Sequence, residues 1–188
     1  MNEQTPLPVS EAARAVARCL VASTRLLMAR RVHQPTARVG LRLRFGDCTR
    51  TAVYRETVLL AAVPRDPCVL VVEFRLRGVR GRGHALFRRE SLLNTPLFVG
   101  FPGFVSKLWL AHDEHGVYRG LYEWDGPDRA EAYARALWRV LALVSARDSI
   151  HYRVLSGLRR DEIIDQPRIL GGTAAPDAAE WWRLVDAA

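Results

Sequence analysis

The stretch that most constrains the fold is residues 103–141, where the hydrophobic period changes. GFVSKLWLAH (103–112) and GVYRGLYEWD (116–125) each alternate and are rich in aromatic and β-branched residues, which is typical of β-strands. Only DEH separates them, which predicts a hairpin. After Asp125 the apolar residues take helical spacing, and Pro127 stands where the start of a helix tolerates a missing N–H. The stretch therefore predicts a hairpin followed directly by a helix.

Flanking segments extend this pattern in both directions. CVLVVEFRL (68–76) predicts a strand, and a helical stretch follows over 84–100, interrupted near Asn94. SIHYRVL (149–155) predicts a last strand. The resulting βαββαβ order is ferredoxin-like, an α+β fold with two helices on one face of an antiparallel sheet. The other face needs a cover, and a second copy of the sheet supplies one, so we expect a homodimer.

The remaining residues flank this unit. Ser10 predicts the cap of an amphipathic helix that ends near Val32, with an apolar stripe that packs on the domain or on a partner. LRLRF (41–45) and RTAVYRETVL (50–59) predict a β-hairpin. We therefore expect three parts. These are an N-terminal extension of helix and hairpin packed on the core (1–66, with 1–8 disordered), a ferredoxin-like domain (67–158) and a polar C-terminal tail (159–188) with an apolar clip at 181–185.

Positive charge is concentrated in the first half of the chain. The net charge is +8, and residues 1–90 carry 17 arginines against 7 acidic residues. No helix-turn-helix or aromatic-interleaved basic motif accompanies this charge, so we do not expect nucleic-acid binding. The basic face of the N-terminal helix (Arg14, Arg18, Arg25, Arg30 and Arg31) leaves a weak contact with a membrane surface open.

The cysteines and histidines give no sign of a metal site or a disulfide. The three cysteines, Cys19, Cys48 and Cys68, are scattered, which is typical of reduced thiols in a cytoplasmic protein. His112 and His115 flank the hairpin tip without a third ligand. Neither a secretory signal nor a run of about 20 apolar residues is recognisable. We expect a cytoplasmic protein without a metal or a cofactor.

Lys107 is the single lysine of the chain, against 27 arginines. If DEHG forms a four-residue turn, Lys107 lies opposite Tyr122, and Trp109 lies opposite Gly120. One face of the hairpin then combines aromatic rings with a cation: Val105, Lys107, Trp109, Tyr118, Tyr122 and Trp124. The opposite face is apolar: Phe104, Leu108, Leu110, Val117 and Leu121. Amphipathic rings around one cation are typical of a small-molecule pocket, although the same rings also suit a core and the lysine a solvated strand.

The segment PGFVSKLWL…GVYRGLYEWDGPDRAEAY, within residues 102–134, resembles the dimeric α/β-barrel superfamily, particularly its small monooxygenase branch. Members show Pro-Gly before a lysine-containing strand, an aromatic strand ending in Trp or Phe, and a helix with an acidic, Ala-rich first turn. The resemblance extends over residues 68–157. It implies a dimeric α/β barrel, and it implies that Trp124 lines the cavity between sheet and helices.

Candidate site residues follow from the faces and from the resemblance. We predict Lys107 and His84 as catalytic residues, Lys107 to bind or stabilise an anion and His84 to act as a base. We predict six substrate-binding residues: Trp109, Tyr118, Tyr122, Trp124, Asn94 and Arg75. The function expected is a cofactor-independent, monooxygenase-like enzyme acting on an apolar or aromatic small molecule with an ionisable oxygen. Alternatives are a natural-product cyclase or isomerase, and a non-catalytic small-molecule-binding or membrane-peripheral protein.

Overall fold

The computed structural model describes residues 6–60, 62–79, 81, 83–84, 87, 91–146, 148–171 and 177–188. The strands are β1 (Val32–His33), β2 (Arg42–Phe45), β3 (Arg50–Leu59), β4 (Pro67–Arg75), β5 (Phe104–Leu110), β6 (Val117–Asp125), β7 (His151–Ser156) and β8 (Leu184–Ala187). The helices are α1 (Val9–Met28), α3 (Pro127–Val144) and α4 (Arg160–Asp165), with 3-10 turns η1 (Ser91–Leu97), η2 (Pro167–Leu170) and η3 (Ala178–Glu180).

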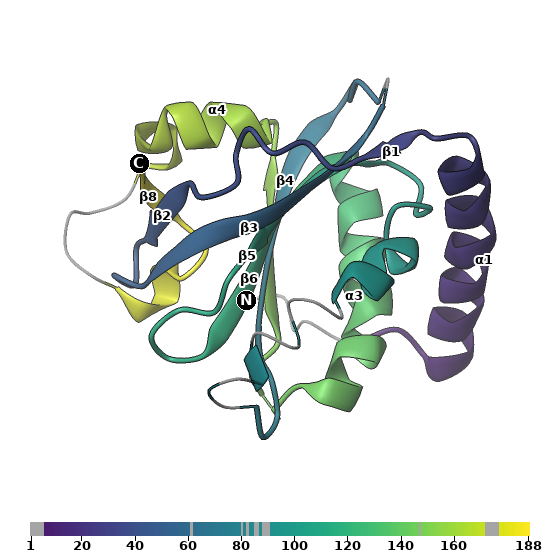
Figure 1. Cartoon of the computed structure of the whole chain (residues 1–188), viewed down its shortest axis with the longest axis horizontal. Helices are drawn as coiled ribbons and strands as arrows, with labels where there is room; N and C mark the ends of the chain where they lie inside the picture. Colours follow the sequence, from purple (N-terminus) through teal and green to yellow (C-terminus); the bar gives the residue numbers. More distant parts are fainter. Residues whose placement is uncertain are drawn as a thin grey trace.

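All strands join one curled antiparallel sheet in the order β7-β4-β6-β5-β3-β2-β8, with β1 paired to β3. One end of the sheet, β7-β4-β6-β5, comes from the four strands predicted for the ferredoxin-like unit, and α3 connects β6 to β7 on the helical side (Figure 1). This arrangement confirms an α+β fold consistent with the ferredoxin-like class. Of the helix predicted over 84–100, residues 91–97 form the 3-10 turn η1, and 85–86 and 88–90 lie outside the described residues.

The hairpin of β5 and β6 has the predicted register, since Lys107 pairs with Tyr122 and Trp109 with Gly120. The predicted faces need one correction. An irregularity between Phe104 and Ser106 shifts the pairing, so Phe104 lies opposite Trp124 and packs against its ring, with centroids 5.6 Å apart. One extra residue in a strand moves the side chains that precede it to the opposite face of the sheet. For this reason the alternation assigned Phe104 to the wrong face.

The N-terminal extension continues the central sheet. β3 pairs with β5 on one edge and with β2 on the other, and β2 pairs with β8 from the C-terminus (Figure 1). The predicted hairpin 41–45/50–59 is thus present as β2 and β3. The backbone hydrogen bonds of this hairpin join the C-terminal strand β8, through β2, and strand β5 of the predicted core, through β3.

The C-terminal segment is not a polar tail, which corrects the prediction. Ile163 and Ile164 of α4 and Leu184 of β8 are buried against the sheet face that carries Leu108 and Leu121. The same face holds a buried ion pair between Glu56 and Arg160, 2.7 Å apart. The chain therefore covers its own second sheet face. The need for a second copy on that face is removed, and the homodimer stays a prediction.

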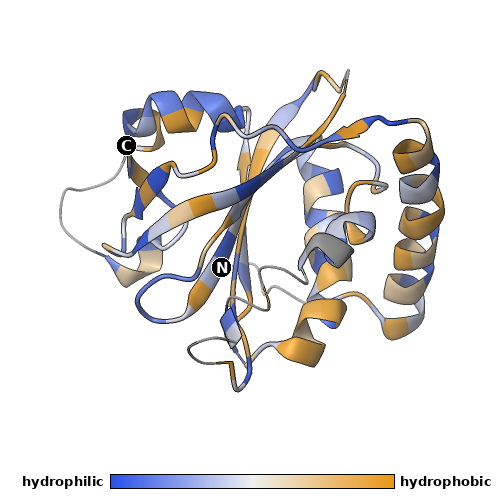
Figure 2. Ribbon diagram, in the orientation of Figure 1, coloured by the Kyte–Doolittle hydropathy of each residue, from blue (hydrophilic) through white to orange (hydrophobic). Residues whose placement is uncertain are grey.

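The N-terminal helix packs on α3 and η1 through small side chains. α1 follows Pro8 rather than a Ser10 cap and ends at Met28. Its buried face consists of Ala12, Cys19 and Ser23, and a Cβ on Gly100 would lie only 2.2 Å from the Cys19 carbonyl oxygen. Large side chains do not fit so close a contact. The predicted apolar stripe consequently faces outward and exposes Leu20, Val21, Leu27 and Met28 (Figure 2). Within the described residues, no helix has both the length and the apolar character needed to cross a membrane.

Candidate functional site

A cavity of about 770 Å³ lies between the sheet and the helical layer. β3, β5 and β6 form its floor, η1 one wall, and the apolar side of α3 another, through Leu137 and Leu141. Both leucines are partly buried. Leu143, 77% exposed, and the exposed Arg77 also line the cavity, so it reaches the surface at the end of α3.

Lys107 extends from β5 into this cavity and is 7% exposed. Its Nζ lies 3.2 Å from the ring centroid of Trp109, 4.6 Å from that of Tyr122 and 4.7 Å from that of Phe98. Within the described part of the chain, the amine has neither a carboxylate partner nor a hydrogen-bond acceptor. Three aromatic rings therefore surround a nitrogen that has no counter-ion among these residues.

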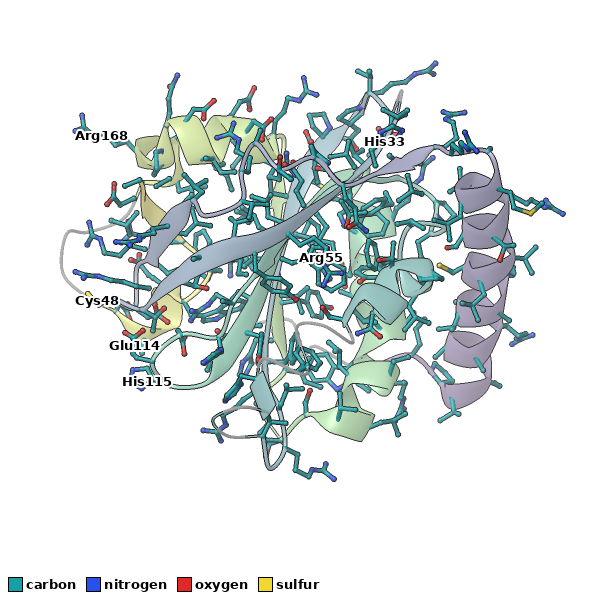
Figure 3. The ribbon with its side chains drawn as sticks, in the orientation of Figure 1. His33, Cys48, Arg55, Glu114, His115 and Arg168 are labelled. Carbon is teal, nitrogen blue, oxygen red and sulfur yellow. The ribbon has the colours of Figure 1, made fainter. Side chains whose placement is uncertain are left out.

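Burial lowers the pKa of the Lys107 amine well below its ordinary value, because an ammonium loses its hydration among the rings. The positive charge of Arg55 lowers the same pKa further. Arg55 extends from β3 opposite Trp109, with its guanidinium carbon 4.5 Å from the centroid of the indole, and it donates a hydrogen bond to Ser91 Oγ. Figure 3 shows Arg55 near the middle of the molecule, where water screens its charge little. The site thus shifts Lys107 toward its uncharged form relative to a lysine in water.

Two hydrogen-bonded tyrosines, Tyr122 and Tyr133, line the cavity. Tyr122 faces Lys107 across the β5–β6 pair, and its hydroxyl accepts a hydrogen bond from Tyr133 at 3.3 Å. Burial raises the pKa of both hydroxyls, so each keeps its proton. Trp109 is fixed by a 3.0 Å hydrogen bond from its indole nitrogen to Thr57 Oγ1. Hydrogen bonds therefore orient the rings of Trp109 and Tyr122 around Lys107, and Tyr122 keeps a hydroxyl hydrogen that its bond with Tyr133 does not use.

Tyr118 lines another part of the cavity and links it to His84. The Tyr118 hydroxyl lies 2.9 Å from His84 Nδ1, and the His84 ring stacks on His112 with centroids 3.9 Å apart. His84 itself is not among the lining residues. The structure places this predicted base behind Tyr118, one side chain away from the cavity.

The other predicted site residues divide into two groups. Asn94, Trp109, Tyr118 and Tyr122 line the cavity with Lys107. Trp124 does not, because it is fully buried between Phe104 and Tyr133, with ring centroids 5.6 and 4.7 Å away. Arg75 is exposed at the end of β4, where its neighbours Phe74 and Leu76 point to the cavity and alternation sends Arg75 the other way.

Arg55 and Tyr54 contribute to the site and were not predicted. Strand alternation places successive residues on opposite faces, but the pairing of β3 with β5 shifts between Val53 and Arg55. As a result Tyr54 lines the cavity while Arg55 lies over Trp109, and Glu56 points to the opposite face toward Arg160. The alternating sequence carries no signal for such an irregularity.

In the residues described here, no three His, Cys, Asp or Glu side chains lie close enough together to hold a metal ion. No protein-family profile and no curated protein matches the chain. A solved structure from Listeria monocytogenes, described as an "uncharacterized ferredoxin fold protein related to antibiotic biosynthesis monooxygenases", is similar over 72% of this chain and 88% of its own, with 13% identity and a TM-score of 0.43. Because both the sequence identity and the TM-score are low, the fold is assigned from the strand order of the chain itself.

Proposed function

We propose that this chain is a cofactor-independent, monooxygenase-like enzyme that binds an apolar aromatic molecule with an ionisable oxygen. The observation that carries the proposal is the Lys107 amine, which borders an aromatic cavity without a carboxylate partner among the described residues. The surrounding rings suit an aromatic ligand, and the amine suits an acidic hydroxyl.

Lys107 acts first as a base. Its uncharged amine takes the proton of a phenol or enol, and the resulting ammonium then pairs with the phenolate or enolate oxygen. A lone charge is costly among the aromatic rings, so the ammonium and the oxygen anion are more stable when they form together as a contact pair. The Tyr122 hydroxyl donates a further hydrogen bond to the anion.

The anion then reacts with molecular oxygen at carbon. In the net reaction a CH₂ group and O₂ become a carbonyl group and water, so the substrate itself supplies the electrons. A cyclase or isomerase shares the proton transfer but consumes no oxygen. A measurement of oxygen uptake therefore distinguishes the monooxygenase-like reaction from cyclisation or isomerisation.

Two probes test these steps. With 4-nitrophenol in mildly acidic buffer, we expect the coloured phenolate to appear on binding to the wild-type chain. Lys107→Met should weaken binding by about tenfold to a hundredfold, the loss of one charge-assisted hydrogen bond. The exposed Arg168→Met serves as the matched control. Absence of the phenolate band with bound nitrophenol contradicts base action. Anthrone, whose enol is a polycyclic phenol, then tests for uptake of labelled oxygen into product.

The outward face of α1 supports a second proposal, which does not involve the cavity. We propose that it makes a weak contact with an anionic membrane surface. Leu20, Leu27 and Met28 are 40%, 43% and 81% exposed, and the exposed Arg14, Arg18 and Arg25 follow the edge of that face. Apolar side chains bordered by arginines suit the boundary between acyl chains and anionic headgroups.

Sedimentation with phosphatidylglycerol vesicles tests this contact against vesicles of phosphatidylcholine alone. We expect binding only to the anionic vesicles, and we expect the double substitution Leu20→Gln and Leu27→Gln to reduce it. Val39→Gln, at an exposed position outside α1, is the control. If the face instead mediates self-association, light scattering will show a concentration-dependent mass that the double substitution lowers, without vesicle binding.

A further inference from the structure

The nitrogen of Lys107 has the surroundings of a nucleophile as well as of a base. It lies in a cavity with room for a small molecule, next to the guanidinium of Arg55, and no carboxylate of the described residues contacts it. We propose that Lys107 forms an imine with an aromatic aldehyde or ketone bound in the cavity. This carbonyl-capturing activity rests on the proposed function in one respect, which is that both use the same aromatic cavity.

An amine attacks a carbonyl only through its lone pair, so an ammonium is inert. Lysines that react in this way are desolvated or stand near another cation. Lys107 meets both conditions, since its side chain is buried among three rings and Arg55 shares the Trp109 ring with it. The lowered pKa of Lys107 agrees with this geometry.

The reaction balances without an external oxidant or reductant. The Nζ lone pair forms a bond to the carbonyl carbon, and the C=O electron pair moves to the oxygen. A proton passes from nitrogen to oxygen to give a carbinolamine, which then loses water. The net change is one amine and one carbonyl converted to one imine and one water.

Tyr122 is positioned to assist this step. It lies directly across the strand pair from Lys107, and its hydroxyl accepts the hydrogen bond from Tyr133, so that bond does not use its own hydrogen. The hydroxyl is therefore a donor to the carbonyl oxygen as negative charge develops there. Because burial raises its pKa, Tyr122 serves as a hydrogen-bond donor and does not ionise.

The chain offers an unusually clean test, because Lys107 is its single lysine and the N-terminal amine is the internal control. The full-length protein is incubated with cinnamaldehyde at neutral pH and reduced with sodium cyanoborohydride. Mass spectrometry of the intact chain and its peptides then locates the adduct. We expect an adduct on Lys107 that forms about tenfold or more faster than on N-acetyl-lysine amide. Lys107→Arg and Lys107→Met should remove it and leave N-terminal labelling unchanged.

Tyr122→Phe keeps the ring and should slow adduct formation on Lys107. Labelling at the N-terminus alone, or at Lys107 only in urea, overturns the inference. Its failure is distinguishable from failure of the proposed function. If nitrophenol ionises on binding but no adduct forms, Lys107 acts as a base and does not form an imine. If an adduct forms but nitrophenol does not ionise, Lys107 forms the imine and does not act as a base.

Discussion

Arg55 and Lys107 lie over the same indole ring, with the guanidinium carbon 4.5 Å and the amine nitrogen 3.2 Å from the centroid of Trp109. Two cations attracted by one ring also repel each other. Because arginine holds its proton more tightly than lysine does, the repulsion lowers the pKa of Lys107. The pair explains why the single lysine of an arginine-rich chain is suited to act as a base or a nucleophile.

Lys107→Met should stabilise the fold most at low pH. The folded pKa of Lys107 lies below its unfolded value, so between the two the unfolded chain binds more protons and stability rises with pH. Methionine removes this dependence. Urea unfolding from about pH 6 to about pH 10 should show the advantage of the variant shrinking as pH rises toward the ordinary lysine pKa. A constant difference over that range would indicate that Lys107 titrates normally.

Gly120→Ala should impair the cavity more than the fold. Gly120 faces Trp109 across the hairpin, and a Cβ there would lie 2.6 Å from the Tyr122 ring. The methyl group must displace that ring, which borders Lys107. We expect weaker 4-nitrophenol binding and a stability loss of about 1–3 kcal/mol. If titration shows an unchanged affinity for 4-nitrophenol, the position of the Tyr122 ring does not affect ligand binding.

Gly100→Ala should loosen α1 from the rest of the molecule. The added Cβ would lie 2.2 Å from the Cys19 carbonyl oxygen and 2.6 Å from the Ser23 backbone nitrogen, and backbone atoms cannot rotate aside as a side chain can. It should also weaken the 2.7 Å hydrogen bond from Ser23 Oγ to the Pro96 carbonyl oxygen. We expect a loss of about 1–3 kcal/mol in thermal unfolding and faster amide exchange in α1. Ala13→Ser, on the exposed side of α1, is the control.

Removal of residues 159–188 should make the chain self-associate. The deletion uncovers the sheet face around Leu108 and Leu121, and an apolar face of this kind requires a partner. By light scattering we expect the truncated chain at a larger multiple of its own mass than the full chain of 21.2 kDa. A full-length dimer that the deletion leaves unchanged would place the interface elsewhere.

Local patterns in the sequence determined much of the central architecture. Alternation and turn residues predicted β2 to β7 within about two residues, and the short DEH turn fixed Lys107 opposite Tyr122. Hydrophobic period and hairpin length are properties of neighbouring residues, so a sequence reveals them directly. The grouping of Lys107, Trp109 and Tyr122 at one cavity followed from the same parity.

Other features depended on contacts between distant segments. The irregularities beside Val53 and Phe104 placed Arg55 over Trp109 and buried Trp124, although alternation predicted neither. Small residues at the contact with Gly100 decided which face of α1 is buried, against the larger apolar side chains of its opposite face. The C-terminal residues occupied the sheet face for which a second copy had been expected. Each outcome depends on how closely two distant backbones approach, and only the tertiary structure determines that distance.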